Sequence, residues 1–155
     1  MNSMGKTSLS FVLRVITDGC IVLNVISMIG LFWIARLMEE SLTETFGWSE
    51  PYWFILIFFA ICGFFTLGIL IQGHQILRTL EKNQPFDALN AKRFFRIGIF
   101  CLLLATAFLA KIFMYNTPLT VAGAFIFYLA ALISFILSDV FSKASKIWEE
   151  QQLTI

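Results

Sequence analysis

The chain has 155 residues, of which 59% are hydrophobic and only 14% are charged, and its mean hydropathy is +0.84. A soluble domain is closer to half apolar and a quarter charged, so this composition excludes an ordinary soluble protein and indicates that most side chains face lipid or other membrane helices. The formal net charge of +1 is uninformative as a sum, whereas the placement of the charges along the chain is informative.

Four apolar segments are each long enough to cross a hydrocarbon layer of about 30 Å as a helix. They are residues 15–35, 52–71, 97–114 and 119–137. The first segment is too long for a cleaved signal peptide and contains Asp18 and Asn24, so we expect it to be retained. The sequence therefore predicts an all-α fold over residues 1–155, a single membrane domain built as a bundle of four transmembrane helices.

Two polar connectors of different character separate the first three segments. Residues 36–51 contain four glutamates, which we expect to be solvated, and end in a turn before the second span. Residues 72–96 carry five of the eleven basic residues. We expect the second helix to continue into water and to stop near Pro85, and Asp87 to cap the third helix, so that this connector forms a helical hairpin.

The last part of the chain predicts two helical features. Ala130, Ser134 and Ser138 lie four residues apart on one face of the fourth span, a spacing typical of close helix packing in membranes. The tail, residues 139–155, has apolar residues at the spacing of one helix face. It predicts an amphipathic helix that lies on the membrane surface or packs on the central connector.

Basic residues predict the orientation. If the N-terminus is cytosolic, nine of the eleven basic residues lie on the cytosolic side, against Arg36 and Lys111 on the other. The nine are Lys6, Arg14, Arg78, Lys82, Lys92, Arg93, Arg96, Lys143 and Lys146. The positive-inside rule therefore predicts that both termini and the central connector are cytosolic.

Polar residues within or beside the spans form one candidate site: Asp18, Asn24 and Asp139. The purely structural interpretations of two of them are a local Arg14–Asp18 ion pair and an interhelical hydrogen bond from Asn24. The functional alternative is a small oligomeric transporter or channel subunit in which the three residues line a path. The sole histidine, His74, is expected at an exposed helix position near the headgroups, and Lys111 is expected to reach the outer surface.

Catalytic and metal-binding patterns are weak throughout. The three cysteines fall in different apolar segments, and no phosphate-binding loop or hydrolase motif occurs. We therefore expect no enzyme activity, no metal site and no cofactor.

A second candidate site is a cytosolic partner-binding surface on the connector and tail. Its predicted members are Arg78, Lys82, Pro85, Phe86, Asn90, Lys92, Arg93, Arg96, Trp148, Leu153 and Ile155. The default alternative for Lys92, Arg93 and Arg96 is attraction of anionic lipid in the bilayer.

Two stretches carry a family resemblance. One is the connector with Asn83–Phe86, Asn90–Arg93 and Arg96–Gly98, and the other is the ending Glu149–Ile155. Together they resemble a bacterial family of small four-helix membrane proteins of unknown function. This chain departs from the family's pattern, with Asn83 where glycine is usual, Leu89 where an acidic residue is usual and Phe94 where leucine is usual; its ending, with Gln151 and Gln152, is also less acidic.

The resemblance implies a location in the bacterial plasma membrane and no known enzyme activity. It also implies a genomic neighbour, because such genes often lie beside one for a small helix-turn-helix DNA-binding protein. We therefore expect a membrane-embedded regulatory protein that binds or modulates a small cytosolic partner of that kind and does not itself bind nucleic acid. A homo-oligomer is the arrangement that the transport alternative requires.

Overall fold

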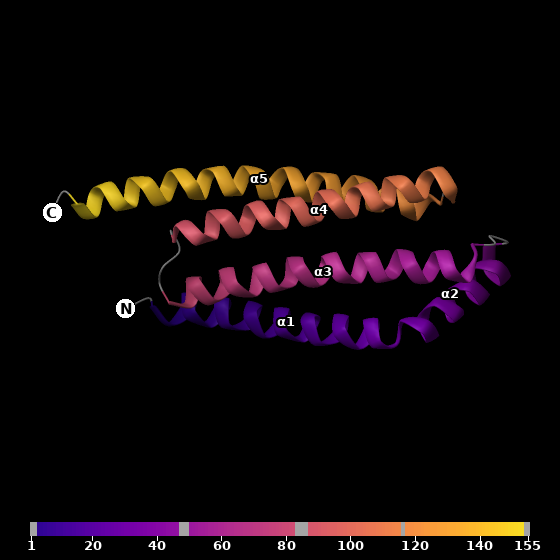
Figure 1. Cartoon of the computed structure of the whole chain (residues 1–155). Helices are drawn as coiled ribbons and strands as arrows, with labels where there is room; N and C mark the ends of the chain where they lie inside the picture. Colours follow the sequence, from indigo (N-terminus) through magenta and orange to yellow (C-terminus); the bar gives the residue numbers. More distant parts are fainter. Residues whose placement is uncertain (1–2, 47–49, 83–86, 116, 154–155) are drawn as a thin grey trace.

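The computed structural model describes residues 3–46, 50–82, 87–115 and 117–153, and these residues form five helices (Figure 1). The helices are α1 (Ser3–Ile29), α2 (Leu31–Phe46), α3 (Tyr52–Glu81), α4 (Ala88–Met114) and α5 (Pro118–Leu153). All of them except α2 are long and apolar enough to cross a membrane. The predicted all-helical fold with four spans is confirmed, and the chain has the architecture of a multi-pass membrane protein.

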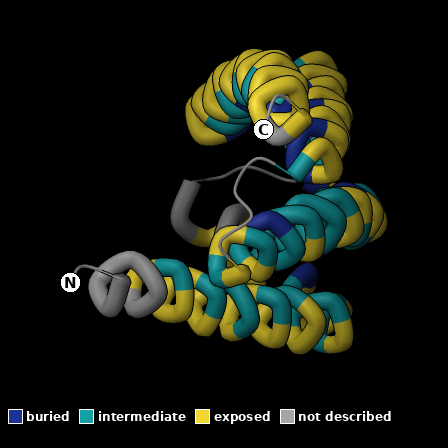
Figure 2. The backbone as a smooth tube through the Cα atoms, turned by 90° about the vertical axis from the view of Figure 1, so that its left-hand side faces the viewer, coloured by how far each residue is buried: buried dark blue, intermediate teal, exposed yellow. Residues whose placement is uncertain are grey.

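The four long helices stand in an open row (Figures 1 and 2). Helix α1 packs on α3, α3 on α4, and α4 most extensively on α5. Among the described residues, no Cα atom of α1 comes within 8 Å of α4 or α5, nor does any of α3 come that close to α5. The predicted bundle therefore has no common core, and each helix is stabilised mainly by its immediate neighbours in the row.

Both termini lie at the same end of the molecule, which we call the termini end; the opposite end, where α2 lies, is the α2 end (Figure 1). The end of α3, the start of α4 and the last part of α5 also lie at the termini end (Figure 1).

The first predicted span, residues 15–35, is divided at Gly30. Glycine is a poor helix former, and the chain turns there so that α2 leaves the line of α1 and packs on α3 (Figure 1). Ala35 is completely buried, whereas the prediction placed it at the end of a lipid-facing span. Most of the predicted first connector is also helical, up to Phe46, because it is rich in strong helix formers such as leucine, methionine and glutamate.

Local signals in the sequence identified the starts of α3 and α4. The carbonyl oxygen of Pro51, the N-cap of α3, accepts from the backbone nitrogens of Phe54 at 2.9 Å and Ile55 at 3.2 Å. The predicted cap of α4 is confirmed, since Asp87 Oδ1 accepts from Leu89 N at 2.9 Å. The predicted stop near Pro85 lies outside the described residues, and α3 ends just before it at Glu81.

The tail is helical as predicted, but up to Leu153 it continues α5 without a break instead of forming a separate surface helix. No proline follows Pro118 and no glycine follows Gly123, so nothing in this segment ends the helix. At 1.5 Å per residue the 36-residue helix is about 54 Å long. It extends past the start of α4 at the termini end (Figure 1), and we call residues 139–153 the projecting end of α5.

Small residues form the interface between α4 and α5. Gly98 faces the ring of Phe135, and Gly123 faces the ring of Phe108. The predicted seam on α5 faces inward, because Ser134 is buried and the hydroxyl of Ser138 donates to the backbone carbonyl of Ala91 on α4 at 2.8 Å. Backbones that approach this closely are held by van der Waals contact rather than by a hydrophobic force.

Candidate functional site

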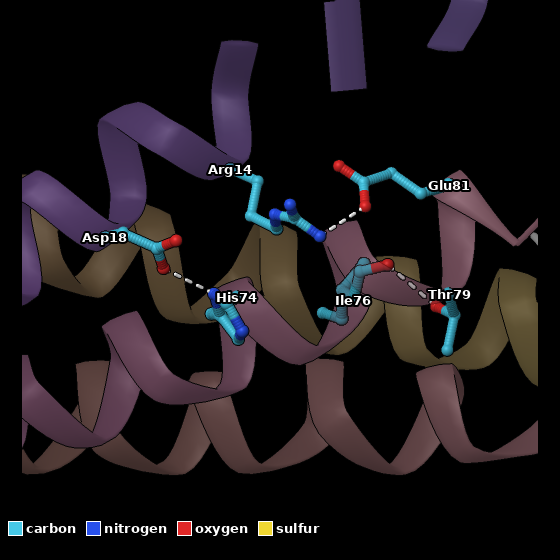
Figure 3. Close-up of polar contacts among 6 residues, drawn as sticks. All are labelled: Arg14, Asp18, His74, Ile76, Thr79 and Glu81. Atoms are coloured by element: carbon cyan, nitrogen blue, oxygen red, sulfur yellow. Dashed lines mark hydrogen bonds and ion pairs between the residues drawn. The ribbon is translucent and has the colours of Figure 1, made fainter. Parts of the chain in front are cut away.

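A buried polar cluster joins α3 and α4 at the termini end. The side chain of Asn90 is completely buried, and its Oδ1 accepts from Arg93 at 2.8 Å. The Thr79 hydroxyl lies 3.0 Å from the same oxygen and shares its proton with the backbone carbonyl of Ile76, which is nearer, at 2.7 Å (Figure 3). Arg93 also approaches the backbone carbonyl of Gln75 at 3.4 Å. These contacts join the two helices of the hairpin, so Asn90 is buried between them, and Arg93 is half-buried beside it.

Truncating Asn90 tests this structural role. We expect Asn90→Ala to lower the free energy of unfolding by about 1–3 kcal/mol, because the Arg93 guanidinium loses its hydrogen bond to the buried side chain of Asn90. Unfolding in detergent, followed by circular dichroism, measures the change. Leu89→Ala is the control on the preceding residue, which is exposed, and we expect it to stay within about 0.5 kcal/mol of the unmodified protein. Equal losses in the two variants would contradict the assignment.

Two pairs of charged or titratable side chains join α1 to α3 near the same end (Figure 3). Arg14 contacts Glu81 at 2.5 Å, and Asp18 Oδ1 lies 2.6 Å from His74 Nδ1. The predicted local Arg14–Asp18 pair is therefore wrong, although both residues do lie on one face of α1. That face is turned toward α3, which offers each of them a partner from another helix. His74 is half-buried in this interface and not at an exposed position.

The remaining members of the predicted partner surface are found in different surroundings. Arg78 and Lys82 are exposed near the end of α3, and Trp148 and Leu153 are exposed on the projecting end of α5. The other predicted members Pro85, Phe86 and Ile155 lie outside the described residues.

Lys92 and Arg96 belong to a separate feature, a groove of about 340 Å³ between α4 and α5. Its lining residues are Ala91, Lys92, Phe95, Arg96, Ser138 and Ser142. Asp139, beside Ser138, does not line the groove, and its carboxylate accepts from Lys143 at 2.7 Å. The charge of the groove is therefore entirely basic.

The predicted interhelical hydrogen bond of Asn24 is not found among the described residues. Its Oδ1 atom is buried, and no described residue donates a hydrogen bond to it. Asn24 instead lines a cavity of about 330 Å³ bounded by α1, α2 and α3, together with Ser27 and Thr66. Such a space, with an unpaired polar atom in its wall, is large enough for water.

The three polar residues of the transport hypothesis do not come together in one chain. Asp18 and Asn24 lie on α1, whereas Asp139 lies on α5, and the described parts of these helices are not in contact. Asp139 is also exposed and paired with Lys143. A path lined by all three residues would have to be assembled from neighbouring copies.

At the α2 end, the structure contains an ion pair that sequence reasoning missed. Glu50 Oε1 lies 3.1 Å from Lys111 Nζ, with side chains only 3% and 12% exposed. The ammonium group also lies 5.1 Å from the centre of the Phe58 ring. Glu50 is therefore not a solvated member of the acidic connector, and Lys111 does not extend to the outer surface. The residues are far apart in sequence and carry no motif that would link them.

No metal-binding cluster of three or more histidine, cysteine or acidic residues occurs within the four described ranges. The chain matches the profile of a family described as "Protein of unknown function (DUF2975)" over residues 33–155, which span most of α2 and all of α3, α4 and α5. No curated protein matches the chain, and no solved structure matches it.

Proposed function

We propose that this chain, which belongs to the DUF2975 family of proteins of unknown function, is a membrane-embedded docking protein for a small cytosolic partner. Binding takes place at the termini end, on the projecting end of α5 and the exposed basic residues near the end of α3.

Charge distribution supports a cytosolic location for the termini end. Nine of the eleven basic residues lie in segments that this orientation places in the cytosol. Of the two on the opposite side, Lys111 is paired with the buried carboxylate of Glu50. The pairing further reduces the positive charge that would have to face outward.

The projecting end of α5 is the observation that carries the proposal. Residues 118–138 contain no charge, and Leu153 lies fifteen residues farther along the same helix, about 22 Å beyond Ser138. Ile147, Trp148 and Leu153 are 56%, 50% and 87% exposed there. Apolar side chains that extend beyond the hydrocarbon layer have no acyl chains to cover them, and exposed apolar patches of this kind mark interaction sites.

The partner that we propose is a small helix-turn-helix DNA-binding protein, which the family resemblance implies. Arg78 and Lys82 are exposed near the end of α3 and would attract an acidic surface. A DNA-binding protein keeps its basic face for the phosphate backbone, so we expect contact through a different and more acidic face.

Co-purification tests the proposal. The protein would carry an N-terminal tag, since α2 packs on α3 and an insertion in the first connector would disturb that packing. We expect one small helix-turn-helix protein to be recovered from the native host in mild detergent. The triple variant Ile147→Ser, Trp148→Ala, Leu153→Ser should lower its recovery at least about tenfold, because exposed aromatic and apolar anchors carry most of the binding energy at interfaces.

The matched control is the pair Phe113→Ala and Leu119→Ala at the α2 end, where the side chains are 84% and 80% exposed. This variant removes apolar surface that is equally exposed but lies at the opposite end of the molecule. It should retain the partner fully. Unchanged elution volume and helicity show that both variants fold. Undiminished recovery in the triple variant, or the absence of any helix-turn-helix protein, would refute the proposal.

A further inference from the structure

The groove between α4 and α5 has the position of a lipid headgroup site. On α4 it adjoins residues 97–110, an uncharged stretch of about 21 Å, and on α5 it adjoins residues 118–138, an uncharged stretch of about 31 Å. Arg96 directly precedes the stretch on α4, and Ser138 is the last residue of the stretch on α5, just before the charged Asp139. The groove therefore lies where the hydrocarbon layer gives way to headgroups, whichever side of the membrane faces the cytosol.

Its cations are available for a ligand. Lys92 and Arg96 are exposed, one helical turn apart, and neither forms an ion pair with another residue in the described ranges. Nearby basic residues are engaged elsewhere, Arg93 with Asn90 and Lys143 with Asp139. A guanidinium beside an ammonium group suits the oxygens of a phosphate, because arginine can bind two of them at once.

The two serines of the groove, Ser138 and Ser142, favour a ligand that carries hydroxyl groups. The hydroxyl proton of Ser138 is donated to the backbone carbonyl of Ala91, so the oxygen of Ser138 offers a ligand only lone pairs. Ser142 lies one turn farther along α5 and can donate as well as accept. A headgroup that carries its own hydroxyls beside the phosphate would fit this combination. Phe95, which is 51% exposed, provides an apolar wall on the side of the acyl chains.

We propose that this groove binds the headgroup of an anionic glycerophospholipid of the phosphatidylglycerol type. Arg96 and Lys92 hold the phosphate, Ser138 accepts from a glycerol hydroxyl, and the acyl chains run along Phe95 into the hydrocarbon layer. Basic pockets between membrane helices at headgroup depth are suited to such lipids. An acidic segment of a soluble partner would have to enter the headgroup layer to reach the same groups.

Lipid retention by the purified protein tests the site without any partner, so its outcome is separate from that of the docking proposal. The protein is equilibrated in mixed micelles with equal amounts of phosphatidylglycerol and phosphatidylcholine, and the bound lipid is identified by native mass spectrometry. We expect the double variant Lys92→Gln, Arg96→Gln to bind phosphatidylglycerol about thirty times more weakly. The control Arg78→Gln, Lys82→Gln removes two exposed charges outside the groove and should weaken binding no more than about twofold.

A variant that changes no charge distinguishes lipid binding in the groove from diffuse electrostatic attraction to the protein surface. Ser142→Leu fills the groove and leaves every charge in place, and we expect it to lower phosphatidylglycerol retention at least about tenfold. Equal losses in the groove and control charge variants, or full retention in Ser142→Leu, would overturn the proposal. Inorganic phosphate at millimolar concentration distinguishes a free-anion site. If it displaced the lipid completely, and the same variants abolished its binding, the site would be one for free phosphate and the lipid proposal would be wrong.

Discussion

Replacing Lys111 by alanine should lower the free energy of unfolding by about 3–5 kcal/mol, one of the two largest effects that we expect of single substitutions in this chain. The variant leaves the carboxylate of Glu50, whose side chain is only 3% exposed, without its cation. Removing one partner of a buried ion pair is costly because the remaining charge stays desolvated. The contact between the ammonium group and the ring of Phe58 is lost as well.

The double variant Glu50→Gln, Lys111→Met shows whether charge is the cause. It removes both charges and keeps side chains of similar length, so we expect it to recover to within about 1 kcal/mol of the unmodified protein. Equilibrium unfolding in increasing denaturing detergent, followed by far-ultraviolet circular dichroism, provides the measurement. A double variant no more stable than Lys111→Ala would show that the packing of these side chains matters more than their charges.

The exposed pair Asp139–Lys143 is the matched control. It has a similar separation, 2.7 Å, but its side chains are 63% and 72% exposed. Exposed ion pairs contribute little, so Lys143→Ala should change the free energy of unfolding by no more than about 0.5 kcal/mol. A loss as large as that of Lys111→Ala would mean that burial does not set the contribution of the pair at the α2 end.

The features that could be predicted from the sequence are those set by local physics. Long apolar runs are sufficient to predict four spans, since a hydrocarbon layer tolerates backbone only when its polar groups are bonded within the helix. The cap at Asp87 could be predicted because its carboxylate accepts from the backbone nitrogen of Leu89, which is only two residues away. The break at Gly30 was less predictable, because a single glycine is often tolerated within a helix and only the packing of α2 on α3 decides its effect here.

The pairings between helices were not predictable in the same way. Arg14 and Asp18 were correctly placed on one face of α1, yet their partners Glu81 and His74 depend on how that face is turned toward α3. Asn90 was predicted to belong to the partner-binding surface, and it is buried because the rotation of α4 directs it toward α3. Hydropathy carries no information on such rotations, so the contacts that the candidate residues make with other helices could not be predicted from it.

The other large effect concerns the closest approach of α4 to α5. A Cβ atom added at Gly98 would lie 2.7 Å from the nearest ring atom of Phe135, and one at Gly123 would lie 2.6 Å from that of Phe108. At either distance the phenylalanine ring or the helices must shift to admit a methyl group. We expect Gly98→Leu to lower the free energy of unfolding by about 3 kcal/mol and Gly98→Ala by about 1–2 kcal/mol, because overpacking outweighs the gain in helix propensity. Unfolding in detergent measures both.

Substitutions at two other glycines measure the effect of helix propensity without a steric contact. A Cβ atom added at Gly19 or at Gly73 would meet no side chain within 4 Å, so alanine there should be neutral or should stabilise the helix by up to about 1 kcal/mol. A second substitution gives a rescue test, since Phe135→Leu shortens the side chain that opposes Gly98 and should recover part of the loss caused by Gly98→Ala. If alanine at Gly98 and at Gly73 had the same effect, the α4–α5 contact would not depend on glycine. If only Gly98→Ala is destabilising and the rescue succeeds, the close contact between α4 and α5 holds together the two walls of the basic groove.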